Sequence, residues 1–76
     1  VLGVTTYNFT LDLKYGDKGD EVTELQKFLA SGGYLTATPN GNFGSATLDA
    51  LKKYQSANSL TADGMVGPLT REILNK

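Results

Sequence analysis

Few side chains in this sequence could carry out chemistry, because it contains neither histidine nor cysteine. Thiolate nucleophiles, imidazole bases, disulfides and zinc sites built on these residues are therefore excluded. Carboxylate pairs remain, and such pairs can cleave glycosidic bonds. The candidate acids are Asp12, Asp17, Asp20, Glu21 and Glu24. Three of them cluster at the start of an expected helix, where the helix dipole already favours negative charge, so we do not expect an enzyme.

The same acids offer little to a metal or a cofactor. Asp17 and Asp20 lie three residues apart and could help to hold a hard cation, but solvated acids in a turn are the more common outcome. Neither a phosphate-binding nor a dinucleotide-binding glycine pattern occurs. The sequence therefore predicts no metal site and no cofactor.

A second set of side chains suits the binding of a ligand. The loops carry an aromatic ring, amides and polar groups of the kind that grip the C–H face and the hydroxyl groups of a sugar. The candidate ligand-binding residues are Tyr34, Asn40, Asn42, Asp63 and Met65.

Size and charge limit the possible partners. The 76 residues, 39% of them apolar, fit one small domain, and a net charge of −1 cannot supply the electrostatic attraction that drives binding to nucleic acid. No apolar run approaches the roughly 20 residues that cross a bilayer, so no membrane association is predicted. The chain lacks an initial Met, and we interpret it as a monomeric module within a longer polypeptide.

Three periodic segments predict the elements that position these residues. A helix is expected from about Asp20, its N-cap, to Ser31, followed by Gly32 and Gly33 as a left-handed stop. A second should run from after Gly44 to about Ala57. A third should begin at Pro68, which suits the first helical position.

Residues 1–12 are predicted to form an extended N-terminal arm or the end of a linker, and residues 13–76 the domain. From Tyr7 to Leu13 apolar and polar residues alternate, which is typical of extended chain. Two alternatives stay open here. The segment is a short strand, or its last apolar residues fold back onto a helical core.

An internal repeat is the most informative feature of the sequence. Residues 41–51 and 64–74 share the pattern G-x-[FV]-G-x-x-T-x-x-x-L, and a Gln stands upstream of each, at positions 26 and 55. The first glycine permits a positive φ, Phe43 or Val66 plugs the core, and the second glycine opens a helix. Each unit buries its apolar face only against the others, which predicts an all-α, compact three-helix bundle.

Single residues within this framework carry further expectations. Tyr54 should lie in the core and Tyr15 should pack against the first helix. Valine at Gly44 or Gly67 should be damaging if these glycines have positive φ or lie against another backbone.

These residues resemble the three-helix peptidoglycan-binding domain found beside bacterial cell-wall hydrolases. The likeness covers about Leu13 to Leu74. It is carried by L-x-YGDKGD-x-V-x-x-LQ-x-FL over 13–29, GYL over 33–35, G-x-FG-x-x-T over 41–47, YQ over 54–55 and DG-x-VGP-x-T over 63–70. Ser45 stands where the family often has Pro, Tyr54 where it often has Phe, and Met65-Val66 replaces a more aromatic pair. Matrix metalloprotease pro-regions are similar in fold, but their inhibitory switch requires a cysteine.

The resemblance implies non-catalytic binding of bacterial peptidoglycan, both glycan strand and stem peptide, outside the cytoplasm: in the periplasm, in the cell wall or as a secreted protein. Such binding would anchor an attached hydrolase or surface protein to the wall. The alternative is a structural or protein-interaction module without glycan affinity. Because the repeat places equivalent turns at equivalent helix starts, we expect the two loops to form one shallow groove. In this groove Asn42 would bond an acetamido or peptide group, and Asp63 would either accept a hydroxyl or shape its turn. Tyr34 is either a core residue or a contact that stacks on a sugar face.

Overall fold

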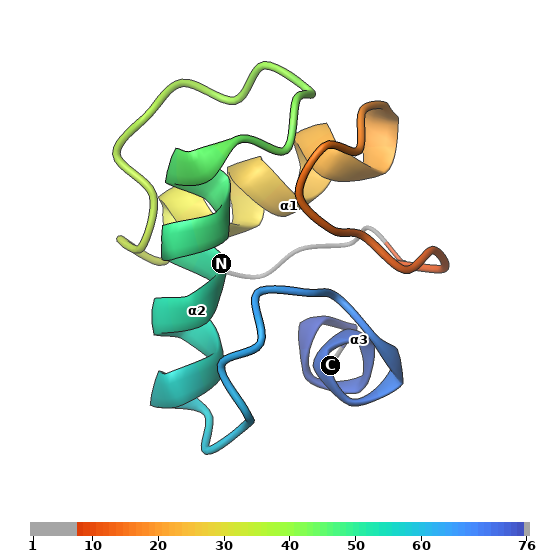
Figure 1. The fold of residues 1–76 in the computed structure, drawn as a ribbon, viewed down its shortest axis with the longest axis vertical. Helices are drawn as coiled ribbons and strands as arrows, with labels where there is room; N and C mark the ends of the chain where they lie inside the picture. Colours follow the sequence, from red (N-terminus) through yellow and green to blue (C-terminus); the bar gives the residue numbers. More distant parts are fainter. Residues whose placement is uncertain (1–7, 76) are drawn as a thin grey trace.

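The computed structural model describes residues 8–75 and contains the three expected helices. α1 spans Asp20–Ser31, α2 spans Ser45–Ala57 and α3 spans Pro68–Leu74. Two isolated antiparallel bridges, Leu13 with Val66 and Lys18 with Asn42, are the only β pairing in the described range, which holds no strand. Figure 1 shows α1 crossing behind the first turns of α2, with α3 seen almost end-on beside the lower half of α2. The all-α, three-helix fold is confirmed.

The start of α1 differs from the expectation in one respect. Asp20 is the first helical residue and not the N-cap, and Gly19 holds the cap position with a φ of 133°. Side chains with a Cβ rarely adopt this conformation, so a glycine is required before the helix. Asp20 keeps a favourable place in the first turn, close to the positive end of the helix dipole.

Both long helices end in the same way. After α1, the Gly33 N–H donates to the Ala30 carbonyl (3.1 Å) and the Tyr34 N–H to the Leu29 carbonyl (2.8 Å). After α2, the N–H groups of Ser59 and Leu60 make the equivalent bonds. This is the Schellman motif, in which one residue after the helix is left-handed. Gly33 has a φ of 84°, as expected for the stop, whereas Ser59 adopts 61° with a side chain.

The core lies where the three helices and the loops between them meet. Phe43 and Val66 are buried, so both are the core plugs that the repeat predicts, and Tyr54 is buried as expected. The buried apolar residues are Phe9, Leu13, Val22, Leu25, Leu29, Leu35, Phe43, Ala50, Leu51, Tyr54, Val66 and Leu74. One expectation about the core is wrong, because Tyr15, expected against α1, is 62% exposed. On α3, Leu69 is 69% exposed, since the helix turns Thr70 and Leu74 inward.

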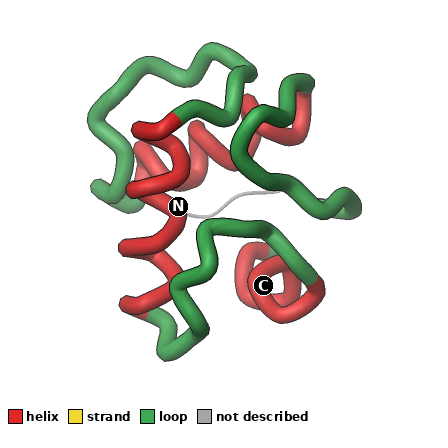
Figure 2. The backbone as a smooth tube through the Cα atoms, viewed as in Figure 1, coloured by secondary structure: helices red, strands yellow, loops and turns green. Residues whose placement is uncertain are grey.

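The N-terminal arm is attached to the helices at several points. Phe9 is buried in the core, and its backbone exchanges two hydrogen bonds with the Asn75 side chain beyond α3 (2.7 and 3.0 Å). Figure 2 shows this loop segment approaching the bundle beside α1. Asp12 pairs with Arg71 of α3. Phe9 therefore folds back onto the helical core, which was one of the two alternatives for this segment. Val4 and Tyr7 lie outside the described residues.

Candidate functional site

A buried glutamine organises the first repeated turn. The Gln26 amide nitrogen donates to Asn40 Oδ1 (3.1 Å), the Asn42 carbonyl (2.9 Å) and Thr47 Oγ1 (2.9 Å). Its carbonyl oxygen accepts from the N–H groups of Asn40 and Gly41, both at 2.9 Å. One side chain on α1 thereby satisfies the backbone of the turn and joins it to the start of α2.

The second turn repeats this arrangement with other residues. The Gln55 amide nitrogen donates to Asp63 Oδ1 (2.9 Å), the Met65 carbonyl (2.9 Å) and Thr70 Oγ1 (3.2 Å), and its oxygen accepts from the Gly64 N–H (3.0 Å). Thr47 and Thr70 are both buried, as the repeat predicts. The sequence pairs the two glutamines by position, but their contacts appear only in the structure.

Two of the candidate ligand-binding residues take part in these networks. Asn40 Oδ1 also accepts from the Asn42 N–H (2.9 Å), and Asp63 Oδ1 accepts from the Met65 N–H (3.0 Å). Each side chain thus shapes its turn by bonding the backbone two residues ahead, a usual role of Asn and Asp in turns. For Asp63 this is the second of the two roles considered above.

The repeat glycines divide into two conformational classes. The first glycine of each unit, Gly41 or Gly64, has the expected positive φ of 81° or 74°. The second glycine does not, because Gly44 and Gly67 are extended N-caps with φ of −104° and −112°. A Cβ built on either would meet no other atom within 4 Å. Gly44 and Gly67 therefore neither have a positive φ nor lie against another backbone, and the two reasons for expecting damage by valine do not apply.

Residues 13–19 connect the two turns. Leu13 exchanges backbone hydrogen bonds with Val66 (3.1 and 2.7 Å), and the Gly16 N–H donates to the Phe43 carbonyl (2.9 Å). The Gly19 N–H donates to the Gly41 carbonyl (3.0 Å). The two turns are thus held through a shared segment that lies between them.

Two surface hollows accompany the turns, and neither combines residues of both loops. The larger, about 430 Å³, is lined by Asp12, Leu13, Lys14, Asp63, Met65, Val66, Gly67 and Pro68. The smaller, about 220 Å³, is lined by Tyr34, Leu35, Thr36, Ala46, Asp49, Ala50 and Lys53. The structure therefore brings Asp63 and Met65 together and places Tyr34 elsewhere. Neither of these two hollows is the groove expected across both loops, which stays a prediction.

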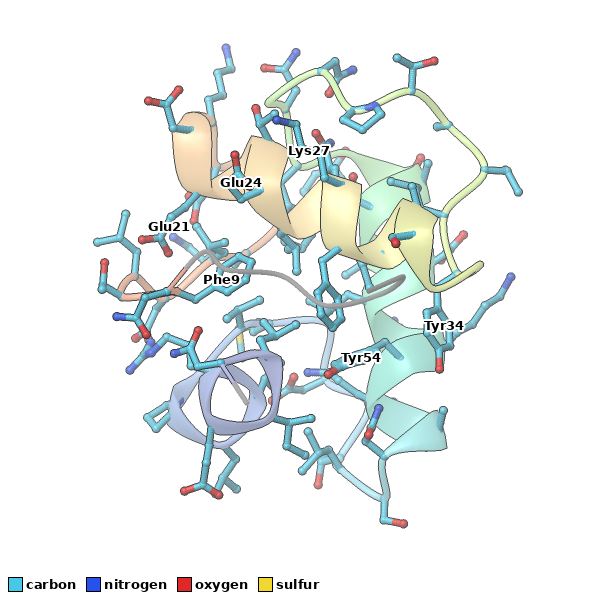
Figure 3. All side chains as sticks on the ribbon, turned by 180° about the vertical axis from the view of Figure 1, so that it is seen from behind. Phe9, Glu21, Glu24, Lys27, Tyr34 and Tyr54 are labelled. Atoms are coloured by element: carbon cyan, nitrogen blue, oxygen red, sulfur yellow. The ribbon has the colours of Figure 1, made fainter. Side chains whose placement is uncertain are left out.

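The position of Tyr34 is set by aromatic packing and by the helix stop that precedes it. Its ring meets the Tyr54 ring edge-to-face, with centroids 5.5 Å apart and planes at 85°, and Phe28 meets Tyr54 in the same manner at 5.4 Å. Figure 3 shows Tyr34 beside α2 next to Tyr54. Burial, and secondarily the neighbouring Tyr34, raises the pKa of the Tyr54 phenol above its ordinary value.

Asn42 and Met65 occupy equivalent exposed positions in the two turns. The backbone carbonyl of each accepts a hydrogen bond from the amide nitrogen of the buried glutamine of its turn. Each side chain stays at the surface, with Met65 47% exposed. They remain available to a ligand, Asn42 through a polar amide and Met65 through an apolar thioether.

Most of the candidate acids have structural partners. The buried Glu21 carboxylate accepts from the N–H groups of Thr10 and Leu11 and from the Thr10 hydroxyl (2.8 Å), which holds the arm on α1 (Figure 3). Asp17 pairs with Lys14 and Glu24 with Lys27, both at 3.5 Å. Within residues 8–75 no group of three or more His, Cys, Asp or Glu side chains could hold a metal ion. No helix of this part is long and apolar enough to cross a membrane.

Sequence reasoning missed two features. One is the burial of Glu21, which the sequence places only among the acids at the start of the first helix, because a polar helix residue gives no signal of burial until the arm covers it. Asp49 and Lys53, which line the smaller hollow, were not candidates at all. Their spacing of four places both on one face of α2, and this was the signal that could have found them.

Comparison with known proteins identifies the family. The family described as "putative peptidoglycan binding domain" matches residues 18–74. The chain belongs to this family. The solved N-terminal domain of SleB is 33% identical, superimposes with a TM-score of 0.82 and covers 92% of this chain and 93% of its own. A solved fragment, residues 123–326, of an L,D-transpeptidase from Xylanimonas cellulosilytica is 36% identical with a TM-score of 0.80, over 88% of this chain and 33% of that fragment.

Curated relatives are larger proteins with different names. The spore cortex-lytic enzyme of Bacillus cereus is 36% identical over 84% of this chain and 25% of its own length. The N-acetylmuramoyl-L-alanine amidase CwlM of Mycobacterium tuberculosis is 44% identical over 68% and 13%. The zinc D-Ala-D-Ala carboxypeptidase of Streptomyces albus G is 38% identical over 84% and 26%. The chain thus spans about a quarter or less of the length of these three relatives.

Proposed function

We propose that this domain binds bacterial peptidoglycan without altering it, and that it holds an attached cell-wall hydrolase or surface protein on the wall outside the cytoplasm. One observation carries the proposal. The region shared with a cortex-lytic enzyme, an amidase and a carboxypeptidase is this domain, although their named reactions differ. What these names have in common is the wall polymer, so the shared domain is best explained by attachment to that polymer.

Attachment of this kind works by effective concentration. A module that binds an insoluble polymer keeps its partner domain near many equivalent substrate sites, even when each contact is weak. We propose a monomeric module in a longer polypeptide, with contacts to the glycan strand and the stem peptide. Tyr34, Asn42 and Met65 are proposed to touch the ligand, whereas Asn40 and Asp63 act by holding their turns in shape.

The experiment is co-sedimentation of the purified domain with peptidoglycan sacculi at low salt. The folded domain should pellet with sacculi, and it should stay in the supernatant with cellulose or after heat denaturation. Sacculi predigested with a muramidase provide a second control, because they no longer sediment. A folded domain that remains soluble with sacculi from several bacterial types would contradict the proposal and favour a structural or protein-interaction module.

A further inference from the structure

The smaller hollow, between Tyr34 and the outer face of α2, has features of a ligand site that the larger one lacks. Its lining includes the small side chains Ala46 and Ala50 together with Tyr34 and the charged residues Asp49 and Lys53 of α2. Asp49 and Lys53 are exposed, one helical turn apart. An aromatic wall, a carboxylate and an ammonium group therefore surround one shallow volume.

The charged groups of this hollow have no partner among residues 8–75. No hydrogen bond or ion pair joins Asp49 or Lys53 to another described side chain, nor to each other. In the larger hollow, by contrast, Asp12 is paired with Arg71, Lys14 with Asp17, and Asp63 bonds Gln55. The smaller hollow thus presents two charged groups without a partner in this part of the chain, whereas the charged groups of the larger hollow already bond other residues.

The size and chemistry of the hollow limit what it can hold. Its volume of about 220 Å³ is below the roughly 300–1,000 Å³ of sites for drug-sized ligands, so it suits a single small unit of a polymer. Tyr34 offers apolar ring surface to C–H groups. Asp49 can accept from hydroxyl groups and Lys53 can donate to a carbonyl oxygen.

We propose that this hollow binds one N-acetylated hexosamine unit of a glycan strand. The sugar ring would lie against Tyr34, its hydroxyl groups would donate to Asp49, and its acetamido carbonyl would accept from Lys53. This ligand gives Asp49 and Lys53 each a hydrogen-bond partner and gives Tyr34 a C–H face, whereas an apolar side chain would leave both charged groups without a hydrogen-bond partner. The inference rests on the proposed binding of peptidoglycan and adds the part of the polymer that is recognised.

Matched variants on α2 test the site. Lys53→Gln and Asp49→Asn should each weaken binding to sacculi about tenfold, as expected for the loss of one charge-assisted hydrogen bond. Ala46→Leu should weaken it by filling the hollow while leaving all three contact groups in place. The controls are Lys52→Gln and Ala57→Leu, exposed positions on the same helix that do not line the hollow. Both controls should bind like the parent chain.

A soluble probe identifies the chemical class. In a ¹⁵N-resolved NMR titration, a trimer of N-acetylglucosamine should shift the amide signals of Ala46, Asp49 and Lys53, and a synthetic stem pentapeptide should not. If the pentapeptide alone shifts these signals, the assignment to a sugar is wrong. If the parent chain binds sacculi and the three site variants bind equally well, the location is wrong but the proposed function stands. A parent chain that ignores sacculi overturns the proposed function itself.

Discussion

The two buried glutamines are the residues on which the turns depend most directly. Each replaces several water contacts with hydrogen bonds to one turn and one threonine, and Gln55 is only 1% exposed. We expect Gln55→Ala to lower the free energy of unfolding by about 2–4 kcal/mol, because buried donors and acceptors lose their partner. Urea unfolding measures this loss. Ser56→Ala, at the exposed neighbouring position, should change stability by less than about 0.5 kcal/mol, and equal effects of the two substitutions would contradict the role of the network.

The ionisation of the Tyr54 phenol makes the stability of the fold depend on pH. Because its pKa is raised, the folded protein keeps the phenolic proton at a pH where the unfolded chain has released it. The free energy of unfolding should therefore be unaffected by this group below pH of about 10 and should fall as pH rises above that value. Tyr54→Phe should reduce the fall between about pH 9.5 and about pH 11.5 in urea titrations. Tyr15→Phe, at an exposed site, is the control, and the same slope in all three proteins would refute the assignment.

At the scale of elements, the matched helix ends give a paired prediction. Ser59 and Gly33 occupy the same left-handed position after α2 and α1. A Cβ on Gly33 would meet no atom within 4 Å, so the backbone conformation alone sets its preference for glycine. We expect Ser59→Gly to raise the free energy of unfolding by about 0.5–1 kcal/mol and Gly33→Ser to lower it by a similar amount. Thermal unfolding of both variants checks the opposite signs, and shifts in the same direction would contradict the explanation.

For the whole molecule, the arm connects the beginning of the described chain to its end. Phe9 lies in the core, Glu21 holds the next two backbone groups, and Asn75 closes the contact beyond α3. We expect Phe9→Ala to cost about 3–5 kcal/mol, enough to unfold much of a domain this small. Leu11→Ala, at a position 56% exposed, is the control and should cost less than about 0.5 kcal/mol. Similar melting temperatures for both variants would show that the arm adds little.

The features that could be predicted from sequence are those with local causes. Helix bounds follow from caps, from Pro68 at a helix start and from apolar spacing, all of which act within a few residues. The positive φ of Gly41 and Gly64 and the burial of Phe43 and Val66 follow from the repeated turn. The family was visible for the same reason, since its motifs are these turns and helix starts.

Long-range packing decided the rest. Tyr15 points outward and Phe9 inward because of where the arm meets α1 and α3, and no local pattern encodes that meeting. The part that Asn40 and Asp63 take in their turns depends on Gln26 and Gln55, which lie 14 and 8 residues earlier in the chain and bond their side chains. Asp49 and Lys53 look like ordinary surface charges until Tyr34 packs on Tyr54 and encloses a hollow beside them. A side chain's type and spacing are set by the sequence, but its partners depend on which distant segments the core brings within hydrogen-bonding distance.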